Sequence, residues 1–206
     1  LCLGGALLAM MVLPFSPTLN LSDMNIGALF LAAVSGFGVL GILLGGWASN
    51  NKWSLLGSMR AGAQIISYEL SAALALLVIV VFSGSLRLSE IVLSQAQGWW
   101  IWRAPVVGFV AFLLFLVAST AEINRTPFDL AEGESELTAG FHTEYSGLRW
   151  AYFFLAEYMN LFVVSAMGTT LFLGGWMPFH IGQWASFNAV MDLLPAGGWF
   201  GLKVCA

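Results

Sequence analysis

The sequence predicts an all-α protein, a polytopic bundle of transmembrane helices with about five to six spans, on three observations. Hydrophobic residues make up 59% of the 206 residues and charged residues only 9%, whereas soluble domains are roughly 25% charged. The apolar residues form runs of about 20 residues, the length that a helix needs to cross a bilayer core about 30 Å thick. All nine tryptophans lie at or just outside the ends of these runs, at the headgroup depth that indole rings prefer.

The runs divide a single membrane domain, residues 1–206, into predicted spans and loops. The predicted spans are residues 1–13, 25–48, 61–82, 104–121, 150–175 and 199–206. The first and last runs are shorter than a full span, so we expect the chain to be a fragment that begins and ends inside helices. The segments between the runs are predicted to be loops: 14–24, 49–60, 83–103, 122–149 and 176–198.

The loop over residues 122–149 is acidic. It holds six of the eleven acids and two of the seven bases, so it accounts for the whole net charge of −4. The absence of a basic run in the sequence argues against nucleic acid or anionic lipid as the main partner. Basic residues are more frequent on the side of this loop, which predicts that the loop is cytoplasmic or on the matrix side.

The acidic loop contains the start signals of a short helix. Thr126 is a good N-cap and the proline after it suits the first helical position, so we predict a helix over residues 127–138. That helix would place Asp129, Glu132 and Glu136 on one face, where like charges couple their proton affinities. The alternative is a solvated acidic loop, although the phenylalanine and leucine residues between the acids favour a loop packed against protein.

Two glutamates lie inside predicted spans, Glu69 in residues 61–82 and Glu157 in residues 150–175. A carboxylate at that depth costs about 2.5–3.5 kcal/mol, so such residues face protein or water and are often functional. Other polar residues lie near them in sequence: Gln64, Ser67 and Ser71 near Glu69, and Asn160 near Glu157. The pattern predicts a proton or ion path. The alternative is that each glutamate is a neutral, hydrogen-bonded packing residue or lies near the interface.

The glycines of GFGVLG, residues 36–41, match the spacing of a dinucleotide-binding loop. They lie inside a predicted span with no strand before them, which excludes that interpretation. Gly41, Gly45 and Ser49 are instead interpreted as a stripe of small residues that allows close helix packing.

The sequence has no pattern typical of a metal centre, a redox centre or a catalytic nucleophile. His142 and His180 lie in predicted loops, without cysteine or carboxylate at ligand spacing, and Cys2 and Cys205 are interpreted as packing residues. We therefore predict no metal site, no catalytic residue and no electron carrier in this chain.

Four stretches of the sequence carry a resemblance to a known family. They are AEINRTPFDLAEGESELTAGFHTEYSG, FFLAEYMN, ASNNKWSLLGSMRAGAQIISYELS and the closing WFGLKVC. From about Leu13 to the end, they closely resemble the family of the membrane-embedded H subunit of the proton-pumping NADH:quinone oxidoreductase, respiratory complex I. The resemblance implies an eight-helix protein at the junction of the membrane arm and the hydrophilic arm. By this resemblance, we expect the chain to lack the family's first helix, the amphipathic helix after it and the sequence beyond the seventh helix.

The resemblance implies roles for particular residues. The carboxylates of the polar path from the quinone chamber into the membrane match Glu69, Glu122 and Glu157. The acids of the loop beside the chamber match Glu132, Glu134 and Glu136, and its charged, ordered part matches Arg125 and Asp129. Phe154 matches an aromatic position near the quinone passage. We expect Glu132, Glu136, Glu122, Glu69 and Glu157 to relay protons or charge. The family often has Thr in place of Ile123 and Asn in place of His142.

The resemblance also implies a substrate and partners. Ubiquinone or menaquinone would accept electrons in a chamber formed with other subunits, which carry the iron–sulfur clusters and FMN, so this chain alone would bind no cofactor and catalyse nothing. The implied location is the bacterial plasma (inner) membrane, with the mitochondrial inner membrane as the alternative. Other open functions are the equivalent subunit of a related membrane-bound hydrogenase or dehydrogenase, a stand-alone cation channel or antiporter, and a structural anchor.

Overall fold

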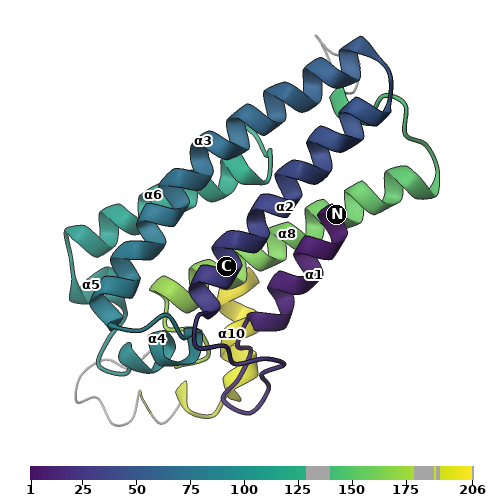
Figure 1. The fold of residues 1–206 in the computed structure, drawn as a ribbon. Helices are drawn as coiled ribbons and strands as arrows, with labels where there is room; N and C mark the ends of the chain where they lie inside the picture. Colours follow the sequence, from purple (N-terminus) through teal and green to yellow (C-terminus); the bar gives the residue numbers. More distant parts are fainter. Residues whose placement is uncertain (129–139, 179–187, 189–190, 206) are drawn as a thin grey trace.

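Long helices run side by side through an elongated bundle in the computed structural model (Figure 1). The structure describes residues 1–128, 140–178, 188 and 191–205, and these residues form helices and loops without a strand. The three longest helices are α2 (Gly27–Ala48), α3 (Lys52–Ser83) and α8 (Leu148–Phe172). The predicted all-α fold class is confirmed.

Shorter helices complete the bundle. Helix α1 (Cys2–Val12) packs against α2 and α8, and α6 (Val107–Glu122) packs against α3. Helices α4 (Leu88–Ser94), α5 (Trp100–Arg103) and α10 (Ala196–Cys205) gather near one end of the bundle (Figure 1). The acidic loop and the α2–α3 turn meet at the other end. There, Asn51 Nδ2 donates a 2.7 Å hydrogen bond to Glu144 Oε1.

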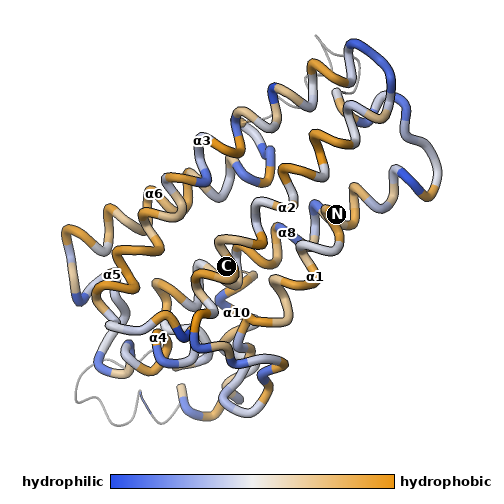
Figure 2. The backbone as a smooth tube through the Cα atoms, viewed as in Figure 1, coloured by the Kyte–Doolittle hydropathy of each residue, from blue (hydrophilic) through white to orange (hydrophobic). Residues whose placement is uncertain are grey.

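The surface of the bundle is that of a membrane protein. In the described part of the chain, α2, α3 and α8 are long and apolar enough to cross a membrane, and α1 and α6 are shorter apolar helices. Figure 2 shows apolar residues along the helices and hydrophilic residues concentrated near their ends. Large apolar side chains such as Leu40, Leu74 and Val81 are exposed, as lipid contact requires. These features fit a multi-pass membrane protein.

Helix α3 begins earlier than predicted, at Lys52 rather than at residue 61. Asn51 caps its first turn, because the side-chain oxygen accepts a 3.0 Å hydrogen bond from the backbone N–H of Trp53. With 32 residues, the helix is about 48 Å long, longer than a bilayer core of about 30 Å. Hydropathy identified only its apolar part, and the preceding turns pack against the end of the acidic loop.

The segment 83–103, predicted to be a loop, contains helices α4 and α5. Helix α4 buries Leu88, Ile91 and Val92 almost completely in the core. With only seven and four residues, these helices are far shorter than the apolar run of about 20 residues that identifies a span. The same hydrophobic core also contains Phe172 and Phe200.

The acidic loop begins as a turn rather than as a helix. Thr126 and Pro127 lie in a turn in which Phe128 N donates a 2.8 Å hydrogen bond to Arg125 O, so the predicted helix does not start at Pro127. The rest of that predicted helix lies outside the described residues, together with Asp129, Glu132, Glu134 and Glu136.

The end of the acidic loop packs tightly on the bundle. A Cβ atom at Gly57 of α3 would lie 2.9 Å from Gly140 Cα, and a Cβ atom at Gly45 of α2 would lie 3.1 Å from Phe153 Cζ. Tyr145 Oη donates a 2.8 Å hydrogen bond to Gly45 O.

Helices α1 and α2 are also closely packed, since a Cβ atom at Gly41 would meet the sulfur of Cys2. The predicted close packing at Gly41 and Gly45 is confirmed.

Candidate functional site

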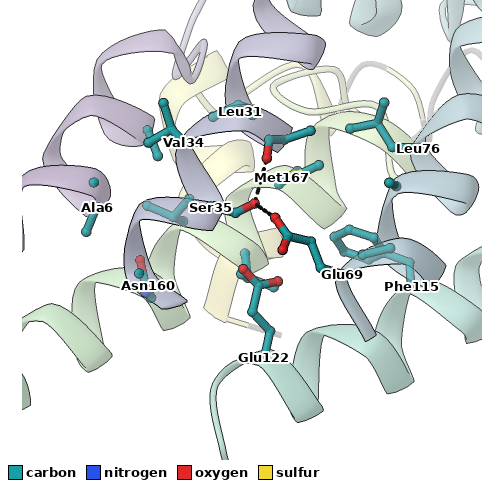
Figure 3. Close-up of a pocket in the computed structure, with 18 of the residues that line it drawn as sticks. Ala6, Leu31, Val34, Ser35, Glu69, Leu76, Phe115, Glu122, Asn160 and Met167 are labelled. Atoms are coloured by element: carbon teal, nitrogen blue, oxygen red, sulfur yellow. Dashed lines mark hydrogen bonds between the residues drawn. The ribbon is translucent and has the colours of Figure 1, made fainter. Parts of the chain in front are cut away.

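A cavity of about 490 Å³ lies among α1, α2, α3, α6 and α8 (Figure 3). Most of its wall consists of small and apolar side chains, among them Ala6, Val34 and Leu76. The polar groups in the wall are the side chains of Cys2, Ser35, Glu69, Glu122 and Asn160. Because such groups are costly to bury without partners, their convergence from five helices marks this cavity as the candidate site.

Glu69 enters the cavity from α3 and meets Ser35 of α2. Ser35 Oγ lies 2.8 Å from Glu69 Oε1 and also 2.8 Å from the backbone oxygen of Ala32. Two glycines of the GFGVLG motif lie beside these polar groups. A Cβ atom at Gly36 would lie 3.8 Å from Glu69 Oε1, and one at Gly38 would lie 3.8 Å from Asn160 Nδ2.

Glu122 is the last residue of α6, and its carboxylate points toward that of Glu69 across the cavity (Figure 3). It also lines a second cavity of about 50 Å³, together with Asn124, His142 and Glu157. Several residues belong to both walls: Cys2, Gly38, Glu122 and Asn160. The two cavities therefore adjoin, and polar groups extend from the acidic loop to Glu69.

Glu157 of α8 forms an ion pair with Arg125, which follows α6, with Arg125 Nη2 3.2 Å from Glu157 Oε1. The guanidinium of Arg125 also lies over the ring of Tyr158, 5.2 Å from the ring centroid. The pair is partly exposed, at 44% for the arginine side chain and 24% for the glutamate side chain. An ion pair with this exposure contributes little to stability, about 1 kcal/mol or less.

The structure brings together four of the predicted site residues: Glu69, Glu122, Glu157 and Arg125. Phe154 lies apart from the cavities, on an exposed face of α8. There it stacks with Trp150 at 5.0 Å between ring centroids and contacts Tyr158 at 4.6 Å. The predicted site residues Asp129, Glu132, Glu134 and Glu136 lie outside the described part of the chain.

Two site residues were not assigned a role from the sequence. Ser35 is one serine in an apolar helix, and such residues commonly bond only to their own helix. Gln64 was noted only as a neighbour of Glu69, yet its Nε2 donates to Ala121 O at 2.9 Å and Phe128 O at 2.8 Å. Its position inside a predicted span was the available signal, since a polar amide there needs partners.

Within the described ranges, no group of three or more His, Cys, Asp or Glu side chains could hold a metal ion. The His142 ring lies tilted against Phe141, with 3.8 Å between ring centroids, and edge-to-face with Phe153 at 5.9 Å. His180 lies outside the described residues. The described site offers carboxylates, a hydroxyl, an amide, a thiol and the guanidinium of Arg125.

Comparison with known proteins identifies the relatives of this chain. The family model described as NADH dehydrogenase matches residues 1–206. The H subunit of NADH-quinone oxidoreductase from Bacteroides fragilis is 57% identical over 188 residues, which cover 91% of this chain and 52% of the relative. The proteins of the same name from Phocaeicola vulgatus and Bacillus cytotoxicus are 52% and 48% identical, over 95% and 98% of this chain and 54% and 56% of theirs. The chain spans about half the length of the curated relatives it matches.

Proposed function

The chain belongs to the NADH dehydrogenase family, and on this premise we propose that it forms part of the membrane-embedded H subunit of a proton-translocating NADH:quinone oxidoreductase. The relatives' name, H subunit of NADH-quinone oxidoreductase, supports the assignment. In this proposal the chain contributes to the enzyme complex without a redox centre of its own. Partner proteins carry the FMN and the iron–sulfur clusters, and other membrane and hydrophilic subunits bind beside it in a bacterial plasma (inner) membrane.

The chain would couple quinone reduction to proton translocation through its carboxylates. The observation that carries this proposal is the pair of adjoining cavities, which Glu157, Glu122 and Glu69 line in that order from the acidic loop inward. A proton gained or lost at one carboxylate changes the electrostatic potential at the next, and low-dielectric surroundings make this effect strong. Glu132 and Glu136 of the acidic loop would extend the path toward the quinone.

The quinone would bind along an exposed face of α8, beside Arg125. Phe154 lies there in an exposed aromatic row with Trp150 and Tyr158, which offers a flat apolar surface to a ring such as that of ubiquinone or menaquinone. Arg125 adds a cation at one end of the row. Asp129 and Glu134 are proposed to belong to the same wall of the quinone chamber.

The proposed path predicts a loss of pumping when its inner carboxylates cannot ionise. Glu69→Gln and Glu122→Gln remove one proton site each and keep nearly the same side-chain volume. In the assembled enzyme in proteoliposomes, we expect each variant to lower quinone-dependent proton translocation by at least about tenfold. The measurement is the rate of proton uptake together with the rate of NADH oxidation.

Glu90→Gln is the matched control for these variants. Glu90 is an exposed acid of α4 at the opposite end of the bundle, where it bonds to Arg87 and Ser85. We expect this variant to pump at the unaltered rate. Unaltered translocation in both the Glu69 and the Glu122 variant would contradict the proposed path.

Cation conduction by this chain alone is a second candidate, because both cavities lie within one chain. It predicts cation flux in liposomes that contain the chain without quinone or redox partners, whereas the main proposal predicts none. A third candidate is the equivalent subunit of a related hydrogenase or dehydrogenase. Identifying the soluble proteins that co-purify with the chain would distinguish this complex from NADH:quinone oxidoreductase. A purely structural anchor would lose assembly, but not coupling, in the glutamine variants.

A further inference from the structure

The Ser35 hydroxyl has two acceptors and one proton to donate. Its oxygen lies 2.8 Å from Glu69 Oε1 on α3 and 2.8 Å from Ala32 O on its own helix (Figure 3). A hydroxyl carries a single O–H donor but can also accept. The two short contacts are therefore alternatives for that proton, and rotation about one side-chain bond exchanges them.

The charge of Glu69 decides which acceptor is preferred. An ionised carboxylate is a stronger acceptor than a backbone carbonyl, so the hydroxyl turns to Glu69 when that residue is ionised. When Glu69 is protonated, its own O–H needs an acceptor. Ser35 Oγ then accepts this proton in a hydrogen bond while its hydroxyl turns back to Ala32 O. Either orientation leaves these partly buried groups partnered, which lowers the cost of placing them in an apolar cavity wall.

The other groups that face Glu69 across the cavity come from three helices. They are the Glu122 carboxylate of α6, the Asn160 amide of α8 and the Cys2 thiol of α1. Glu122 is the acid among them, and its carboxylate points toward that of Glu69 across the cavity (Figure 3). Ser35 supplies the hydroxyl that lies within hydrogen-bond distance of the Glu69 carboxylate.

We propose that Ser35 is a positioning residue of the carboxylate path, a two-position donor whose hydroxyl points to Glu69 in its ionised form and to Ala32 O in its protonated form. This inference rests on the proposed function for its consequence, because only a path through Glu69 makes the switch matter for pumping. The switch lets Glu69 take up and release a proton while one hydroxyl compensates for the change in charge.

The test compares Ser35→Ala with Ser35→Thr in the assembled enzyme. Alanine removes the hydroxyl, and threonine keeps it, with room for the extra methyl group because Ser35 lines the cavity. The matched control is Ser67→Ala on α3, where, among the described residues, an exposed serine donates to its own helix, at 2.7 Å from Ala63 O. Two quantities are measured: the infrared carboxyl band of Glu69, identified by its loss in Glu69→Gln, and coupled proton translocation.

We expect Ser35→Ala to shift the Glu69 band and to lower coupled translocation about tenfold, the effect of losing a hydrogen bond to a charged group. Ser35→Thr should restore the band and most of the rate, and Ser67→Ala should change neither. An unshifted Glu69 band in Ser35→Ala would overturn the inference, and so would a threonine variant that behaves like alanine.

Results that contradict the role of Ser35 can be distinguished from results that contradict the proposed carboxylate path. If Glu69→Gln abolishes pumping but Ser35→Ala leaves the band and the rate unaltered, the path stands and the role of Ser35 is wrong. If Glu69→Gln leaves pumping unaltered while Ser35→Ala shifts the Glu69 band, the path is wrong and the switch is supported.

Discussion

Gln64 lies on α3 with 8% of its surface exposed, and its Nε2 donates to the segment formed by the last residues of α6 and the turn that follows. The acceptors are Ala121 O at 2.9 Å, Asn124 Oδ1 at 3.2 Å and Phe128 O at 2.8 Å. One amide therefore connects α3 to the end of α6 and to the first turn of the acidic loop. Glu122 and Arg125 lie within this same segment, so Gln64 positions two residues of the proposed path.

Gln64→Leu removes these hydrogen bonds while keeping a side chain of similar size. The backbone oxygen of Phe128 then loses a donor in partly buried surroundings, and we expect the free energy of unfolding to fall by about 1–3 kcal/mol. Unfolding in detergent micelles measures the change. Gln97→Leu is the control, since Gln97 is exposed, and it should change the free energy by less than about 0.5 kcal/mol. Equal stability of the two variants would contradict the role assigned to Gln64.

At the scale of secondary-structure elements, the C-terminal end of α8 depends on side chains from elsewhere. The last backbone oxygens of a helix have no partner within it. Gln95 Nε2 donates to Thr170 O at 2.9 Å and Leu171 O at 3.2 Å. Lys203 Nζ of α10 donates to the oxygens beyond: Leu173 O at 2.6 Å, Gly175 O at 3.0 Å and Met177 O at 2.6 Å. The ammonium also complements the helix dipole.

Lys203→Met should therefore weaken the attachment of α10 to α8. It leaves three backbone oxygens without their charged donor in a site where the lysine is only 7% exposed. We expect a loss of about 3 kcal/mol in the free energy of unfolding, measured by unfolding in micelles. Lys52→Met, at an exposed position beside Trp53, should cost about 1 kcal/mol or less. A loss at Lys203 no larger than at Lys52 would show that the carbonyl contacts contribute little.

Hydropathy predicted the long helices whose apolar surface contacts lipid along the whole span. Helices α2 and α8 largely coincide with predicted apolar runs, because lipid contact requires an apolar surface along the whole span. The first turns of α3 were missed because an Asn51 cap and packing on the acidic loop stabilise them, not lipid contact. Helix α4 was missed because its apolar residues are too few to form a run and act through burial in the core.

At the scale of the whole molecule, the individual acids of the site could be predicted from the sequence. Their placement around the same pair of cavities could not. A glutamate in an apolar helix is unusual in any membrane protein, so Glu69 and Glu157 were identified singly. Their placement around adjoining cavities depends on how five helices pack. Ser35 has no distinguishing pattern in the sequence, because only the approach of α3 gives its hydroxyl a second acceptor.

The cavity itself is a property of the whole bundle, and its volume should matter for proton translocation. Ala73 of α3 lines it, so Ala73→Leu would fill part of the space between Glu69 and the apolar wall without adding charge. Ala63→Leu places the same side chain on the exposed surface of the same helix. We expect the Ala73 variant to assemble normally and to lower coupled translocation several-fold, with the Ala63 variant unaltered in both. Translocation is measured in proteoliposomes and assembly by native electrophoresis. If both variants pump equally, the carboxylates exchange protons without this space, and the cavity is only a packing defect among five helices.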